Sequence, residues 1–236
     1  MPPKVEQPVR LRRKQIGSSV PLTDVEVADG AFLELVDRGA NAGAVEMLKK
    51  GQQINVADDR GETAVHKATR RGDVAFVAEL LRYGAVADYA DVDGITPVMI
   101  AVQYGLGGLV GEFVKKGADL FAATKDGSTL LHIAAYSGHE DTLRALLQID
   151  GMDSLIETKD AHGRSPLQVA SFRASKDACA ILVSAGADFA ARDVRGNDCA
   201  TLAGRSGRRK SKDFFETLST VQTAHASQAR DTAGAM

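Results

Sequence analysis

The chain has 236 residues, and its content of 44% hydrophobic and 25% charged residues is typical of a globular protein. The formal net charge of −2 gives no indication of a nucleic-acid or membrane partner at the level of the whole molecule. Two cysteines, Cys179 and Cys199, are too few for a disulfide framework. We expect both to be small buried side chains in a reducing compartment.

The amino-terminal residues predict neither a secretory signal nor a membrane anchor. Residues 1–14 are polar and basic, without an apolar core segment. No apolar run in the chain approaches the roughly 18 residues that cross a bilayer. Residues 1–28 are therefore predicted to be a basic, disordered arm. The expected location of the protein is the cytoplasm, with the nucleus as the alternative.

Residues 29–57 carry the first amphipathic pattern. Phe32, Leu33 and Val36 fall on one face of a short helix, and Met47 and Leu48 belong to a second one. This segment predicts a pair of helices with a small apolar face.

From residue 58 onward the glycines recur with a fixed period. Gly61, Gly94 and Gly127 follow one another at intervals of 33 residues, and Gly163 and Gly196 resume this interval after one of 36. Two further glycine series keep the same phase, and their members are Gly39, Gly72, Gly105 and Gly138, and Gly51, Gly84 and Gly117. The chain therefore contains an internal repeat of about 33 residues.

Each repeat begins with a polar turn, and a residue suited to cap a helix follows two positions after the turn glycine. The oxygen of such a side chain can accept a hydrogen bond from the first helical turn. The capping residues are Thr63, Thr96, Thr129, Ser165 and Asp198. Pro97 and Pro166 then occupy the first helical position, where the missing N–H is not needed. A first helix rich in alanine and a second helix with paired apolar residues such as Leu80 and Leu81 complete the unit.

This turn and helix pair resembles the ankyrin-repeat family. The matching segments are Thr63–Ala68, Thr96–Ala101, Thr129–Ala134 and Ser165–Ala170. The resemblance implies an all-α repeat solenoid, in which stacked helix-turn-helix repeats carry short β-hairpin or turn fingers. The implied domain spans 29–220, and a disordered tail at 221–236 follows it. Its parts are a degenerate cap at 29–57, repeats at 58–90, 91–123, 124–158 and 159–192, and a degenerate cap at 193–220.

The chain departs from the family pattern in three ways, one of which is that Ala174 replaces the glycine that stops the first helix of the fifth repeat. The family's histidine, which bonds to the backbone of the neighbouring repeat, is present as His66 and His132 but is replaced by Met99 and Gln168. The resemblance therefore implies weaker contacts in those two repeats. Three extra residues around 150–154 are expected to enlarge one loop.

No catalytic site or cofactor is predicted. His66 and His132 stand two repeats apart, or roughly 20 Å at about 10 Å per packed helix layer, so they cannot share a metal ion. The glycine-rich segment 105–108 lacks the preceding strand and the lysine of a phosphate-binding loop. We therefore expect a binding protein and not an enzyme.

In ankyrin-like stacks, partners contact the turn tips and the exposed ends of the first helices. The resemblance transfers this role to Arg60, Arg70, Arg71, Ile95, Gln103, Tyr104, Lys125, Tyr136, Arg164, Phe172, Arg173, Arg195 and Arg205. Tyrosine and arginine dominate binding hot spots, and guanidinium groups pair with carboxylates or phosphates. We therefore expect a protein partner with an acidic or phosphorylated segment, bound by an adaptor or scaffold.

Two alternatives remain open. The chain could be a structural subunit of a large cytoskeletal or ciliary assembly, or it could associate with nucleic acid through its basic termini. These termini contain Arg10, Arg12, Arg13, Lys14, Arg205, Arg208, Arg209, Lys210 and Lys212. Short charge runs are more often solvated surface than a binding signal, so nucleic acid is not the expected partner. No membrane partner is expected, and self-association stays open.

Overall fold

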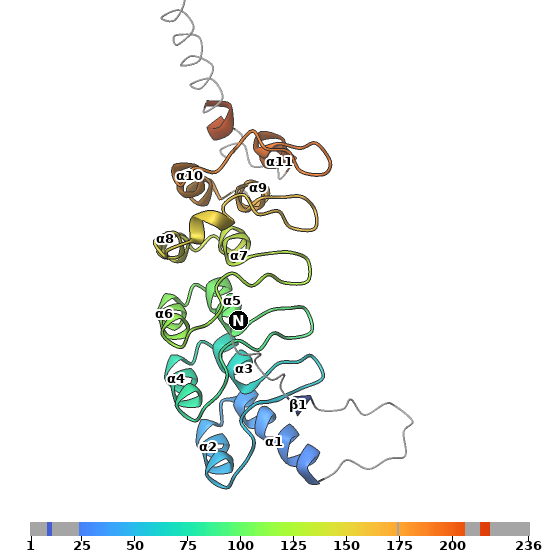
Figure 1. The fold of residues 1–236 in the computed structure, drawn as a ribbon, viewed down its shortest axis with the longest axis vertical. Helices are drawn as coiled ribbons and strands as arrows, with labels where there is room; N and C mark the ends of the chain where they lie inside the picture. Colours follow the sequence, from blue (N-terminus) through green and yellow to red (C-terminus); the bar gives the residue numbers. More distant parts are fainter. Residues whose placement is uncertain (1–8, 11–23, 174, 206–212, 218–236) are drawn as a thin grey trace, which may run out of the picture. The chain divides into compact units, whose positions relative to one another are not determined.

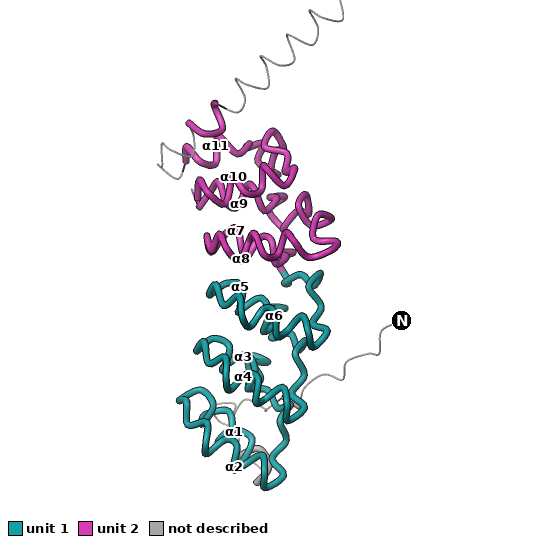
Figure 2. Tube along the Cα trace, turned by 90° about the vertical axis from the view of Figure 1, so that its left-hand side faces the viewer, with its two compact units in different colours: residues 1–125 teal, residues 126–236 magenta. Residues whose placement is uncertain are grey.

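The computed structural model describes residues 9–10, 24–173, 175–205 and 213–217. The chain divides into two compact units, unit 1 at residues 1–125 and unit 2 at residues 126–236 (Figure 2). Within each unit, pairs of helices stack in chain order, the second helix of each pair lies on one side of the first, and the polar turns project on the other (Figure 1). The fold is an all-α repeat solenoid.

Unit 1 contains three helix pairs. Their bounds are α1 Asp24–Arg38, α2 Asn41–Lys49, α3 Ala64–Arg70, α4 Val74–Arg82, α5 Pro97–Gln103 and α6 Gly107–Lys115. The first helices α1, α3 and α5 pack against one another in sequence, and α4 packs on α6. Ala68 of α3 and Ala101 of α5 are fully buried. Small side chains at these contacts allow the first helices to approach closely.

Unit 2 continues the same pattern with one addition. Its elements are α7 Leu130–Ser137, α8 Glu140–Leu147, the 3-10 helix η1 Met152–Leu155, α9 Pro166–Arg173, α10 Lys176–Ser184 and α11 Cys199–Arg205. The first helix α9 packs between α7 and α11, and α8 packs on α10. Residues 213–217 are also helical, and Phe215 there is buried. Cys179 and Cys199 are both buried and free, as expected.

The amino-terminal prediction was wrong at two places. Val9–Arg10 forms the strand β1, which pairs in parallel with β2, Val56–Ala57. Helix α1 begins at Asp24, inside the segment that was predicted to be disordered. Both backbone segments find hydrogen-bond partners that composition alone does not reveal. Residues 1–8 and 11–23 of the predicted arm, the tail 221–236 and most of the two basic clusters lie outside the described residues.

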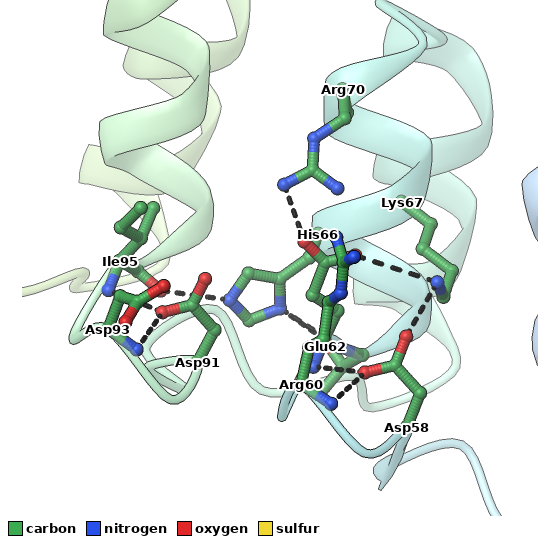
Figure 3. A network of polar contacts seen from close by, with 10 residues as sticks. Asp58, Arg60, Glu62, His66, Lys67, Arg70, Asp91, Asp93 and Ile95 are labelled. Atoms are coloured by element: carbon green, nitrogen blue, oxygen red, sulfur yellow. Dashed lines mark hydrogen bonds and ion pairs between the residues drawn. The ribbon is translucent and has the colours of Figure 1, made fainter.

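Two buried histidines join neighbouring turns in the way the resemblance implies. The Nε2 atom of His66 lies 3.1 Å from the carbonyl oxygen of Ile95 (Figure 3), and that of His132 lies 2.9 Å from the carbonyl oxygen of Arg164. The Nδ1 atom of His66 accepts a hydrogen bond from the N–H of Thr63 at 3.1 Å. Because Nδ1 is an acceptor, Nε2 carries the proton that it donates to the next turn.

Gln168 performs the same role in α9, so the expectation of a weaker contact there was wrong. Its amide Nε2 donates to the carbonyl oxygens of Ala191 at 2.9 Å and Asn197 at 3.2 Å. Its Oε1 accepts from the N–H of Ser165 at 2.9 Å. A glutamine carries a donor and an acceptor at one end and can therefore replace a neutral imidazole.

The capping prediction holds at some repeats and fails at others. Asp198 accepts a hydrogen bond from the N–H of Thr201 at 2.9 Å. The buried hydroxyl oxygens of Thr96 and Ser165 have no hydrogen-bond partner among the described residues. In the Met99 repeat, the thioether cannot replace the ring nitrogen that lies 2.9 Å from the corresponding hydroxyl of Thr63.

The extra residues after α8 form an ordered element. They form η1, in which Met152 is fully buried and Leu155 is buried. The expected loop enlargement is therefore a short helix anchored by apolar side chains.

Candidate functional site

The polar turns of each unit are tied to one another by their backbones. In unit 1 the N–H of Val92 donates to the carbonyl oxygen of Arg60 at 2.8 Å, and in unit 2 the N–H of Ala161 donates to that of Asp126 at 2.8 Å. Gly94 has a φ of +82°, and a Cβ there would stand 3.0 Å from the backbone nitrogen of Lys125. Only glycine fits such a conformation at such a close approach. The turns therefore present their side chains on a rigid frame.

An aspartate at the start of a turn closes it internally. Oδ1 of Asp58 accepts from the N–H groups of Arg60 and Glu62, both at 2.9 Å. Asp91, Asp160 and Asp193 make the equivalent pairs of bonds. These side chains act as acceptors for backbone groups that no helix or strand satisfies.

The predicted turn-tip residues differ in their exposure and in whether their side chains are already bonded within the chain. Arg60, Lys125 and Arg195 are exposed, and Ile95 is half-buried. Arg164 is half-buried and binds Asp160 with two groups, from Nε at 2.9 Å and from Nη2 at 2.7 Å. Its guanidinium is therefore used to hold its own turn.

A network of charges holds Arg70, one of the predicted contact residues of unit 1 (Figure 3). The carboxylate of Glu62, which is only 6% exposed, lies 2.5 Å from Nη2 of Arg70 and 3.5 Å from Nζ of Lys67. Lys67 also pairs with Asp58 at 2.8 Å. The sequence did not predict this network, because Glu62 precedes α3 and helical spacing relates only Lys67 and Arg70 to each other.

The pKa values in this network shift in the direction that ion pairing favours. Burial alone would raise the pKa of Glu62, but the hydrogen bond and charge of Arg70 and the charge of Lys67 outweigh it and lower that pKa. Burial would lower the pKa of Lys67, but the hydrogen bond and charge of Asp58 and the charge of Glu62 raise it. All three groups are therefore charged, and Arg70 already has its counterion.

Arg71 is also engaged within unit 1. Its Nη1 donates to the carbonyl oxygen of Val36 at 2.6 Å, and its Nη2 lies 3.2 Å from Oδ2 of Asp73. The same carboxylate oxygen accepts from Asn41 at 2.7 Å. Arg71 therefore ties the end of α3 to the connection between α1 and α2.

Two predicted residues of unit 1 stand exposed at the end of α5. Gln103 is the last residue of the helix, and Tyr104 follows it with 47% of its surface exposed. The hydrogen bond and the charge of Glu62 raise the pKa of Arg70. Unit 1 therefore presents an exposed aromatic ring and an exposed amide at this helix end, and its Arg70 is already paired.

In unit 2 two of the predicted residues, Tyr136 and Arg173, are in direct contact. The guanidinium carbon of Arg173 lies 4.3 Å from the centre of the Tyr136 ring, and its Nε donates to the carbonyl oxygen of Tyr136 at 3.2 Å. Tyr136 is 50% exposed and Phe172, on the same end of α9, is 47% exposed. Arg205 stands exposed at the end of α11. The cation–π contact confirms that Tyr136 and Arg173 adjoin, and it holds the arginine in one orientation.

The buried cysteines are not reactive groups. Burial raises the pKa of Cys179 to about 11 and that of Cys199 to about 12, so both are thiols at neutral pH. The Oγ atom of Ser171 lies 3.8 Å from Sγ of Cys179. Within the described ranges, no three His, Cys, Asp or Glu side chains group closely enough to hold a metal ion. No helix in the described part of the chain has the length and apolar character to cross a membrane.

Comparison with known proteins agrees with this architecture. A family model described as ankyrin repeats (3 copies) matches the chain over residues 35–124 and again over 106–193. No curated protein matches the chain. Ankyrin repeats generally mediate protein–protein interaction, and proteins that carry them are typically non-catalytic binding modules. Since the two matches span most of its length, this chain belongs to the ankyrin-repeat family.

Proposed function

We propose that this protein is a non-catalytic adaptor that binds an acidic or phosphorylated segment of a partner protein at the ends of α7 and α9. The observation that carries the proposal is the cluster of Tyr136, Phe172 and Arg173. It combines two half-exposed aromatic rings with a guanidinium in a chain that is only 5% aromatic. Aromatic and arginine side chains are the residue types that dominate binding hot spots.

Three of the predicted arginines already have a carboxylate partner, which favours the remaining ones as the binding site for an anion. Arg70 pairs with Glu62, Arg71 with Asp73 and Arg164 with Asp160. Arg173 has no carboxylate partner among the described residues, and its known bonds use only its Nε atom and the face of its guanidinium. Its two terminal NH₂ groups are thus available for a forked pair with a carboxylate or phosphate.

The Tyr136 contact favours binding by fixing this guanidinium in advance. An arginine that is held in place loses less side-chain entropy when it binds than a free one does. The exposed rings of Tyr136 and Phe172 can then bury apolar surface of the partner next to the charged contact.

The test is co-purification from native lysate with the intact chain and the double variant Tyr136→Ala with Arg173→Glu. We expect the variant to lose a prominent partner while its melting temperature falls by only a few degrees, since the Tyr136–Arg173 contact at the surface is worth about 0.5–1 kcal/mol. A matched control is Arg195→Glu, which makes the same change of charge on a turn tip of the same unit. Treatment of the lysate with phosphatase separates a phosphorylated partner from an acidic one.

Recovery of the same complex with the intact chain and the double variant would count against the proposal. That result would favour a subunit held in an assembly by other surfaces. Loss of partner with the Arg195→Glu control to the same degree would show that only the net charge matters.

A further inference from the structure

A groove with a volume of about 610 Å³ lies within unit 2 between α8, η1 and α10. Its volume falls in the range of roughly 300–1,000 Å³ that is usual for ligand sites. It is lined by the second helices of two repeats and by the insertion. It therefore shares no residue with the cluster at Tyr136 and Arg173, and its function can be tested separately.

The three-residue insertion supplies one wall of this groove. The repeat interval of 36 residues in place of 33 falls between Gly127 and Gly163, and the added length forms η1. Met152 anchors η1 in the core, where it is fully buried. The wall is therefore held in place by packing and is not a loose loop.

The floor of the groove is apolar. Leu147 comes from α8, Ile156 follows η1, and Ile181 comes from α10. Ile156 and Ile181 are 7% and 5% exposed, and Leu147 is half-buried. Ile156 and Ile181 therefore leave little surface to cover, and an apolar side chain of an occupant would mainly bury the exposed part of Leu147.

The charges around the groove are those of two helix ends, one carboxylate and one guanidinium. Helix α8 ends at Leu147 and α10 ends at Ser184, and both residues line the groove. The carboxyl end of a helix carries roughly half a negative elementary charge. Asp153 of η1 adds a full negative charge and has no ion-pair partner among the described residues. Arg144 is the only basic residue in the lining.

We propose that this groove is a second docking site, which binds a segment of a partner protein that combines apolar anchor residues with basic ones. The anchors would cover the floor at Leu147, Ile156 and Ile181. A lysine or arginine of the segment would pair with Asp153 and with the helix ends. An acidic segment would instead meet like charge at Asp153 and at the two helix ends, and only Arg144 could pair with it.

The experiment uses two fluorescein-labelled peptides of about 12 residues, or three helical turns. Both carry leucine at the same helical spacing, and the remaining positions are lysine in one peptide and glutamate in the other. Fluorescence anisotropy measures their binding to the full chain. We expect the leucine–lysine peptide to bind more tightly than the leucine–glutamate peptide.

Four variants test whether the peptide binds in the groove. Asp153→Lys should weaken binding of the lysine peptide on the order of tenfold, since an attraction becomes a repulsion. Asp177→Lys makes the same charge change at the opposite end of α10 and should leave binding within about twofold. Ser184→Trp should weaken binding by filling the groove, while Ala190→Trp, at an exposed position outside it, should not. Thermal melts confirm that each variant is folded.

Three results would overturn the proposal. The first is equal binding of the two peptides, and the second is binding of neither peptide at millimolar concentration. The third is an equal loss with Asp153→Lys and Asp177→Lys, which would mean that only net charge is sensed. None of these results would bear on the Tyr136 and Arg173 cluster.

Discussion

Replacement of Gln168 by methionine tests whether a side-chain bond between repeats stabilises unit 2. Gln168 is fully buried and bonds to the N–H of Ser165 and to the carbonyl oxygens of Ala191 and Asn197. Methionine has nearly the same length and shape but leaves these three backbone groups without this partner. A buried donor without a partner costs about 1–3 kcal/mol, and each carbonyl adds less, so we expect Gln168→Met to lower the free energy of unfolding by about 2–4 kcal/mol.

Urea denaturation followed by circular dichroism measures this loss, and amide hydrogen exchange of Ser165 reports on it locally. Gln168→His should cost less than Gln168→Met, because His132 makes the equivalent bond in the preceding repeat. Gln103→Met, at an exposed position, should change stability by less than about 0.5 kcal/mol. A loss with Gln168→Met that is no larger than this control would refute the assigned role of the glutamine.

Further predictions concern pH, backbone conformation and thiol reactivity. Burial lowers the pKa of His66 and of His132, so each histidine stays neutral in the folded chain at a pH where it is protonated in the unfolded one. The free energy of unfolding should therefore be constant above about pH 6.5 and fall below it, as urea titrations between about pH 7.5 and 5.5 would show. A pH-independent free energy of unfolding would contradict this. Gly111→Ala in α6, where a Cβ meets nothing within 4 Å, should raise stability by about 0.5–1 kcal/mol, whereas Gly94→Ala should lower it by more than that, both by thermal melting. Cys179, with its pKa near 11, should resist iodoacetamide at about pH 8 in the folded chain and react in urea, as mass spectrometry would show; equal rates in both states would sink the assignment.

The repeat architecture was predictable because its signals are local. Gly94 has the left-handed conformation that its place in the glycine series indicates, and α5 and α9 begin at Pro97 and Pro166 as expected. Each of these features depends on the conformational range of one residue. The predictions failed where a segment met a partner distant in the sequence, as when Val9–Arg10 paired with Val56–Ala57.

The candidate site was likewise predictable where its signals are local and unpredictable where it depends on distant residues. The resemblance to ankyrin repeats placed Tyr104, Tyr136 and Phe172 at exposed helix ends, and the structure has all three there. Whether an arginine is available to a partner depends on the residues around it in space. Arg71 bonds to a carbonyl 35 residues earlier in the chain, and Arg173 stacks on a ring 37 residues earlier.

The period, the helix pairs, the turns and the family could be read from the residues alone, because glycine, proline and apolar spacing act over a few positions. The replacement of a histidine by Gln168, and the pairing of Arg70 but not of Arg173 with a carboxylate, became evident only in the folded chain. It also decided that an insertion of three residues opens a groove at two helix ends. Hydrogen bonds, ion pairs and cavities depend on the packing of one repeat on the next, and that packing is set by contacts between distant residues.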